Sequence, residues 1–146
     1  MDVDSIVPSD YPELIQIWEA SVRATHGFLS EEDILFLRPL ILEQYFDAVS
    51  LHCLKSESDK ILGFVGVAED NIEMLFISPA YRGKGIGTFL TRFAIKEQGA
   101  IKVDVNEQNP KAVGFYEHVG FEVVGKSALD GQGRPFPLLH MELNEN

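Results

Sequence analysis

The sequence predicts an α/β protein with a mixed sheet and helices on both of its faces. Strand-like segments stand in groups before and after a central strand–helix–strand–helix succession, which places the strands in one sheet with helices against it. A chain of 146 residues without repeats, low-complexity tracts or long linkers fits one folded unit with a sizeable core. We therefore expect a single domain over residues 1–146.

The N-terminal third is predicted to hold a short strand and two helices. Residues 3–7 read as the strand, and a helix follows with Ser9 or Asp10 as its cap. That helix carries four apolar residues on one face: Leu14, Ile17, Trp18 and Val22. A second helical stretch covers residues 34–46, and Pro39 should kink or divide it because proline removes a backbone donor.

The rest of the chain alternates between strand and helix signals. Three strands are predicted at residues 49–57, 60–69 and 71–78. Helical spacing then covers residues 86–95, and a strand at residues 101–105 and a short helix after Pro110 follow it. Two terminal strands, residues 121–129 and 135–143, complete the predicted sheet.

The charge balance narrows the class of partner. The chain has 12 Lys and Arg against 23 Asp and Glu, a formal net charge of −11. Such a surface repels phosphate backbones and anionic lipid, so we expect no nucleic-acid or membrane partner and favour a cationic one. The single cysteine, Cys53, excludes an intramolecular disulfide and indicates a reducing compartment. No stretch is long and apolar enough for a membrane span, and the acidic start is unlike a signal peptide, so a cytoplasmic location is expected.

The segment "RGKGIG", residues 82–87, concentrates glycine and positive charge between a strand and a helix. It is not a nucleotide-triphosphate loop, because Lys84 is followed by Gly85 and not by Ser or Thr. A dinucleotide fold is a rival, since Asp104 ends the next strand where a ribose-binding acid would lie, but its glycine spacing differs. The third interpretation is a pyrophosphate held by backbone N–H groups at a helix N-terminus.

This segment, preceded by "MLFISPAY", resembles the acyl-CoA pyrophosphate loop of the GNAT N-acetyltransferases, Gln/Arg-x-x-Gly-x-Gly/Ala. A second block, "NEQNPKAVGFYEHVGF", resembles the family's Asn-x-x-Ala-x-x-Phe-Tyr-x-x-x-Gly-Phe segment and follows in the family's order. The resemblance covers residues 61–121, and "WEASVRATHGFL" and "GRPFPLLHMEL" also resemble small bacterial members of poorly defined acceptor. It implies the GNAT fold, a mostly antiparallel sheet with a splayed central pair.

The resemblance implies acetyl-CoA as the acyl donor. The strand before the loop would pair with the pantetheine arm through backbone groups of Leu75 and Ile77. The pyrophosphate would lie against seven residues: Arg82, Gly83, Lys84, Gly85, Ile86, Gly87 and Thr88. Asn109 would bond the cofactor in the family, but before Pro110 it is equally well placed as a helix N-cap.

The resemblance also implies catalytic roles. Tyr116 would be the general acid that protonates the departing coenzyme thiolate, although a tyrosine on a short helix is commonly a packing residue. An amine acceptor arrives as an ammonium and must lose a proton, which a carboxylate can assist. Glu73, on the strand that would carry the thioester, is the best-placed base, with Glu69 and Asp70 nearby.

The acceptor is expected to be a primary amine: a lysine side chain, a polyamine or another small cationic amine. Trp18, His26 and Phe28 are candidates to line its pocket. No metal site is predicted, because the histidines and Cys53 show no metal-ligand spacing. A monomer or homodimer is expected. Two alternatives of other classes stay open, an acyl-CoA sensor without turnover and a dinucleotide-dependent oxidoreductase.

Overall fold

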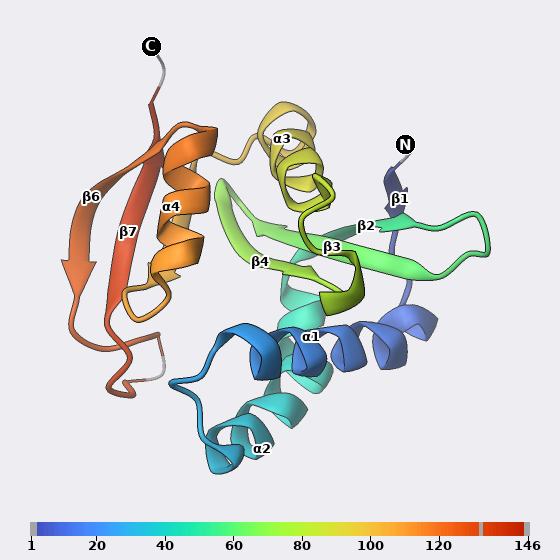
Figure 1. The fold of residues 1–146 in the computed structure, drawn as a ribbon, viewed down its shortest axis with the longest axis horizontal. Coiled ribbons are helices and arrows are strands. Elements are labelled where there is room, and N and C mark those ends of the chain that lie inside the picture. The colour runs from blue at the N-terminus through green and yellow to red at the C-terminus, as the bar shows by residue number, and fades with distance from the viewer. Residues whose placement is uncertain (1–2, 132, 145–146) are drawn as a thin grey trace.

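The computed structural model, which describes residues 3–131 and 133–144, shows a seven-stranded sheet in the order β1-β2-β3-β4-β5-β7-β6 (Figure 1). The strands are β1 (Val3–Ser5), β2 (Ser50–Lys55), β3 (Ile61–Ala68), β4 (Asn71–Ile77), β5 (Lys102–Asn106), β6 (Phe121–Ser127) and β7 (Leu138–Leu143). Every neighbouring pair is antiparallel except β4 and β5, which are parallel. The predicted mixed, mostly antiparallel sheet is confirmed.

One face of the sheet is covered by α1 (Tyr11–Thr25) and α2 (Glu31–Leu40). The four apolar residues predicted to share a face of α1 are all buried in the core on this side: Leu14, Ile17, Trp18 and Val22. Ser30 caps α2 by accepting a hydrogen bond from the Asp33 backbone N–H at 3.1 Å. Pro39 lies in the last turn of α2, and the chain continues as a π-helical segment, Ile41–Tyr45, and a 3-10 turn, Phe46–Ala48. The expected division near Pro39 is therefore present.

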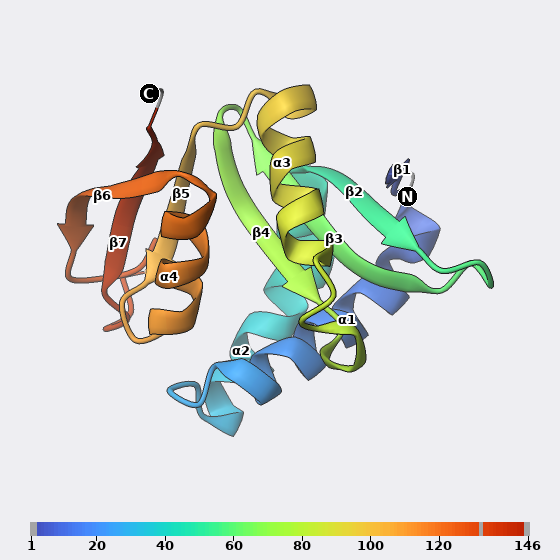
Figure 2. The same cartoon turned by 45° about the horizontal axis from the view of Figure 1, so that its top comes forward.

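The opposite face carries α3 (Ile86–Gln98) and α4 (Pro110–Val119). Leu90 and Ala94 of α3 and Tyr116 of α4 pack with strand residues in a second buried cluster. Helices thus lie on both faces of the sheet, as predicted (Figures 1 and 2). The sheet separates the two buried clusters.

Some predicted boundaries differ from the structure for local reasons. Asp10 stands at the N-cap position of α1, but its carboxylate accepts from the Val7 backbone N–H at 3.1 Å and does not cap the helix. β7 begins at Leu138, after Pro137, because proline has no N–H to offer a strand ladder. β6 ends at Ser127, before a turn in which the Gly133 N–H bonds the Asp130 carbonyl.

Candidate active site

The sheet opens at its centre, between β4 and β5. Only two residue pairs join these strands, Asn71 with Lys102 and Ile72 with Val103. Beyond that point the two strands diverge (Figure 2). β4 itself has a bulge against β3, where Gly66 pairs with Met74 but Val67 pairs with Ile72. The bulge leaves Glu73 without a partner on β3 at the point where the sheet opens.

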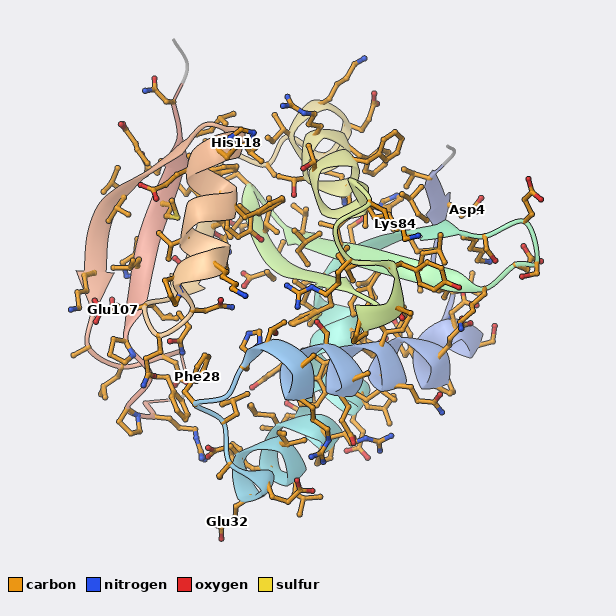
Figure 3. The ribbon with its side chains drawn as sticks, viewed as in Figure 1. Asp4, Phe28, Glu32, Lys84, Glu107 and His118 are labelled. Carbon is orange, nitrogen blue, oxygen red and sulfur yellow. The ribbon has the colours of Figure 1, made fainter. Side chains whose placement is uncertain are left out.

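A cavity of about 530 Å³, here called the main cavity, lies at this opening and extends from α3 and α4 to the end of α1. Its walls come from β4, the start of α4, the end of α1 and residues 82–87, here called the glycine loop. Most residues predicted to bind the acyl donor line it: Leu75, Ile77, Arg82, Gly83, Gly85, Ile86, Gly87, Thr88 and Asn109. The structure therefore brings together segments that are distant in sequence. Lys84 is exposed on the loop that enters α3 and is absent from the lining (Figure 3).

The glycine loop turns into α3 through two left-handed residues. Gly83 has φ +76° and Gly85, the N-cap of α3, has φ +83°. Glycine adopts these angles without steric cost. A Cβ placed on either residue would meet no atom within 4 Å, so the backbone faces open space. The first N–H groups of a helix have no carbonyl partner within it, and here they border the main cavity. Free N–H groups at a helix N-terminus are suited to binding a pyrophosphate.

Asn109 is the N-cap of α4, and its Oδ1 accepts from the Ala112 N–H at 3.3 Å. The residue also lines the main cavity. Because the oxygen makes the cap, the side-chain NH₂ group is left to donate to a ligand. The two roles considered for Asn109 can thus be divided between the two ends of its amide.

Tyr116 lies in the wall of the main cavity and is only 7% exposed. Its ring contacts Phe115 and Phe121 at centroid distances of 5.0 and 5.7 Å. Within the described residues its hydroxyl makes no hydrogen bond. Burial raises the pKa of Tyr116 well above the usual value for a tyrosine, so the phenol stays protonated over the physiological range.

A second cavity of about 400 Å³ lies on the face of α1 and α2. Its lining comprises Tyr45, Ala48, Val49, Ala68, Glu73, Met74, Asp130 and Gly131. Met74 lines this second cavity and Leu75, the next residue of β4, lines the main one. One strand therefore separates the two cavities where the sheet is open. Burial, with a contribution from the charge of Asp104, raises the pKa of Glu73, while a hydrogen bond from Asn71 opposes the rise.

The three residues proposed for the acceptor pocket lie in different surroundings. His26 lines the main cavity, and burial and then the charge of Arg82 lower its pKa. The ring centroid of Phe28 (Figure 3) is 5.2 Å from that of His26. It is 6.0 Å from that of Phe136, which belongs to the β6–β7 connection. Trp18 is 3% exposed inside the core beneath α1 and lines neither cavity. It supports the helix that carries His26.

The α2 region and the connection between β6 and β7 hold each other in place, which sequence reasoning missed. The Arg134 guanidinium pairs with Asp33 of α2, and it lies 4.6 Å from the ring centre of Phe36 and 5.9 Å from that of Phe136. These contacts join the α1–α2 region to the β6–β7 connection. We call the group of Asp33, Phe36, Arg134 and Phe136 the clasp. Its ion pair joins Asp33 and Arg134, which are 101 positions apart, so no local pattern could reveal it.

The structure is at odds with a dinucleotide role for Asp104. Val103 and Val105 are buried on the side of α3 and α4, so Asp104 lies on the other face of β5, away from the glycine loop. Its carboxylate is 2.6 Å from His140 Nδ1.

Within residues 3–131 and 133–144 no three His, Cys, Asp or Glu side chains are grouped so as to hold a metal ion. No helix among these residues is long and apolar enough to cross a membrane.

Comparisons with known proteins agree with this geometry. Residues 34–144 match the family described as Acetyltransferase (GNAT) domain. The chain is 40% identical to the peptidyl-lysine N-acetyltransferase YjaB of Escherichia coli K12 over 129 residues, 88% of this chain and 87% of that protein. The solution structure of apo YjaB has a TM-score of 0.88 at 38% identity, covering 97% and 96% of the two chains. The PaiA N-acetyltransferase of Thermoplasma acidophilum, solved with coenzyme A, shares the fold with a TM-score of 0.74 at 21% identity, covering 99% and 100%.

Proposed function

The chain belongs to the GNAT acetyltransferase family and is an acetyltransferase, and on this premise we propose that it moves an acetyl group from acetyl-CoA to a primary amine by direct attack in a ternary complex. The observation that carries the proposal is the pair of cavities at the sheet opening, which adjoin at consecutive residues of β4, Met74 and Leu75. One cavity can hold the donor and the other the acceptor. The reacting groups would meet where β4 and β5 separate.

The donor would occupy the main cavity. Main-chain N–H groups of the glycine loop and the first turn of α3 would bind its pyrophosphate, and backbone groups of Leu75 and Ile77 would pair with the pantetheine arm. The open space beside Gly83 and Gly85 supports this fit, because close approach to the backbone needs positions without a side chain. The side-chain NH₂ of Asn109 would add a polar contact at the start of α4.

The acceptor would reach the opening from the second cavity. We favour a lysine side chain, because the relative YjaB is named a peptidyl-lysine N-acetyltransferase and because a slender alkyl ammonium suits a cavity that contains Glu73 and Asp130. A polyamine or another small cationic amine has the same reactive group and is the second candidate. The net charge of −11 favours any of these over an anionic acceptor.

Two side chains would manage the protons. Glu73 would take a proton from the acceptor ammonium, which frees the nitrogen lone pair for attack on the thioester carbonyl. Its raised pKa brings this base closer to neutral pH, where proton transfer is most effective. Tyr116 would give its proton to the sulfur of the leaving thiolate, and the second proton lost by the attacking nitrogen would return to Tyr116 through solvent. Because Tyr116 remains protonated at neutral pH, the acid is present whenever the donor is bound.

The reducing compartment predicted from Cys53 is part of the same proposal. Cys53 is fully buried, and burial raises the pKa of its thiol to about 11, so the side chain stays a protonated packing residue. We propose cytoplasmic action as a monomer or homodimer.

The decisive experiment is a screen of amines with acetyl-CoA, read by release of free thiol. We expect turnover with Nα-acetyl-lysine amide or a lysine peptide, and thermal stabilisation by acetyl-CoA of about 2.7 kcal/mol at 100 times its dissociation constant. NAD serves as the matched ligand control and should stabilise nothing comparable. Equal shifts from NAD and acetyl-CoA, or no thiol release with any amine, would overturn the proposal.

A further inference from the structure

A row of polar side chains crosses the C-terminal part of the sheet. Asp104 on β5 and His140 on β7 face each other in register, and their Oδ1 and Nδ1 atoms are 2.6 Å apart. The other ring nitrogen of His140, Nε2, is 2.6 Å from Ser127 Oγ on β6. Three strands therefore contribute one continuous hydrogen-bonded chain, which the proposed transfer chemistry does not use.

The chemistry of these groups assigns the protons. An ionised carboxylate only accepts hydrogen bonds, so His140 Nδ1 carries a hydrogen and donates it to Asp104. In the neutral imidazole, Nε2 then accepts from the Ser127 hydroxyl. Both ring nitrogens are thereby engaged, and the imidazole can hold the Asp104 carboxylate in one orientation.

The hydrogen-bonded row of Asp104, His140 and Ser127 matters because Asp104 lies beside the opening of the sheet. Pairing between β4 and β5 ends at Ile72 and Val103, so the next residues are Glu73 and Asp104. Both side chains lie on the face of α1 and α2: Glu73 lines the second cavity, and Asp104 alternates with the buried Val103. Two carboxylates thus flank the opening where the amine would be deprotonated, and the charge of Asp104 acts on Glu73.

We propose that Asp104 is a positioning residue for acetyl transfer, which sets how strongly Glu73 holds a proton, and that His140 and Ser127 keep the Asp104 carboxylate at the sheet opening. The inference rests on the proposed function, in which Glu73 is the base. In the reaction Glu73 takes one proton from the ammonium and returns it to solvent after the amine has attacked. Asp104, His140 and Ser127 exchange no proton in that step.

The other groups around Glu73 include one that opposes the effect of Asp104, the Asn71 side chain. Asp130 of the β6–β7 connection and Tyr45 of the π-helical segment line its cavity, and the Asn71 side chain hydrogen-bonds it from within β4. On β5, the Lys102 ammonium is 3.9 Å from the Asp70 carboxylate, which offsets its charge. Asp104 is therefore the charged neighbour whose removal should lower the pKa of Glu73.

The direct test measures the titration of the Glu73 carboxyl by carbon-13 NMR in the free enzyme. Asp104→Asn keeps the shape of the side chain and removes its charge, so we expect the Glu73 pKa to fall. Glu142→Gln is the matched control, because it removes one exposed carboxylate from the same sheet face, one register step from Asp104 on the side where the strands stay paired. The Glu142→Gln variant should leave the pKa of Glu73 unchanged. A Glu73 pKa that does not fall in Asp104→Asn, or that falls equally in the control, overturns the inference.

A kinetic test uses acetyl-CoA and Nα-acetyl-lysine amide across pH. In Asp104→Asn the acidic limb of kcat/KM should move to lower pH, and the plateau should drop about 3- to 30-fold, less than general-base loss usually costs. His140→Leu, which removes the donor to Asp104, should reproduce part of this loss. His140→Asn, which restores a donor, should recover it. A profile that is identical in wild type and Asp104→Asn overturns the positioning role.

The failure of the proposed function can be told apart from the failure of this inference. Normal turnover in Glu73→Gln would overturn Glu73 as the base and, with it, the catalytic role of Asp104, even if the NMR shift is present. Reduced turnover in Glu73→Gln combined with an unmoved titration in Asp104→Asn would overturn the inference alone.

Discussion

The two cavities on either side of β4 are built from different materials. The main cavity takes its key groups from the main chain of one short loop and from the first turns of α3 and α4. The second cavity takes its functional groups from side chains of β4, the π-helical segment and the β6–β7 connection. A site made of backbone should respond to changes of chain conformation, and a site made of side chains to changes of charge and shape.

The largest effect is expected from the backbone of the main cavity. Gly85→Val should weaken acetyl-CoA binding by about 100-fold or more, because valine resists the left-handed angle and its side chain would enter the space proposed for the pyrophosphate. Calorimetry measures the dissociation constant. Gly99→Val is the matched control, since Gly99 is also left-handed and open but ends α3 far from the loop. If both variants lose affinity equally, the loop has no special role.

The next effect separates chemistry from binding within the main cavity. Tyr116→Phe keeps the ring contacts and removes only the hydroxyl, so stability and acetyl-CoA affinity should change little. Turnover should fall about 10- to 1,000-fold, the lower part of the range for loss of a general acid, because a thiolate leaves readily. The measurement pairs calorimetry with steady-state rates. Normal turnover in the variant would leave water as the proton donor.

A smaller effect is expected on the acceptor side. Arg134→Met breaks the clasp between α2 and the β6–β7 connection, so the acceptor KM should rise about 3- to 10-fold while acetyl-CoA affinity stays constant. Arg23→Met is the control, because Arg23 also ion-pairs across helices but on the exposed surface of α1 and α2. A loss of acetyl-CoA affinity in Arg134→Met would contradict the division of the two sites.

The smallest effect belongs to the exposed cation of the glycine loop. Lys84→Ala should weaken acetyl-CoA binding only about two- to fivefold, and the difference should fade with added salt, because an exposed charge is screened. Calorimetry at low and high ionic strength tests this. Should Lys84→Ala prove more damaging than Gly85→Val, the pyrophosphate site would be a side-chain clamp.

The same contrast explains what could be predicted from the sequence. The glycine loop and the α4 segment are short and continuous, so their resemblance to two GNAT motifs predicted that residues 82–88, Asn109 and Tyr116 would lie together. All of these except Lys84 line the main cavity. The sheet and its helices followed from periodicity and order along the chain. These features depend on local sequence, which a single chain contains in full.

The acceptor side depends on pairing between distant residues, which periodicity does not specify. Trp18 belongs to the apolar face of α1 and was expected in the pocket, yet that face turns into the core. The relation of Glu73 to Asp104 follows from the register of β4 and β5 and from the bulge at Gly66 and Val67. The sequence singles out Asp104 only as a possible ribose-binding acid, and its contact with His140 depends on β7 lying beside β5.

The two-pair junction between β4 and β5 also bears on how the molecule fluctuates. Because only two residue pairs join β4 and β5, the sheet consists of two parts, β1–β4 and β5–β7–β6, each internally well paired. Backbone amides of β4 beyond Ile72 that face away from β3 have no strand to protect them, and in the free protein they should exchange with deuterium quickly. A donor lying along that edge would act as an eighth strand. Slower exchange of these amides, with the exchange rates of the edge strands unchanged, would report binding of the donor in the absence of an acceptor.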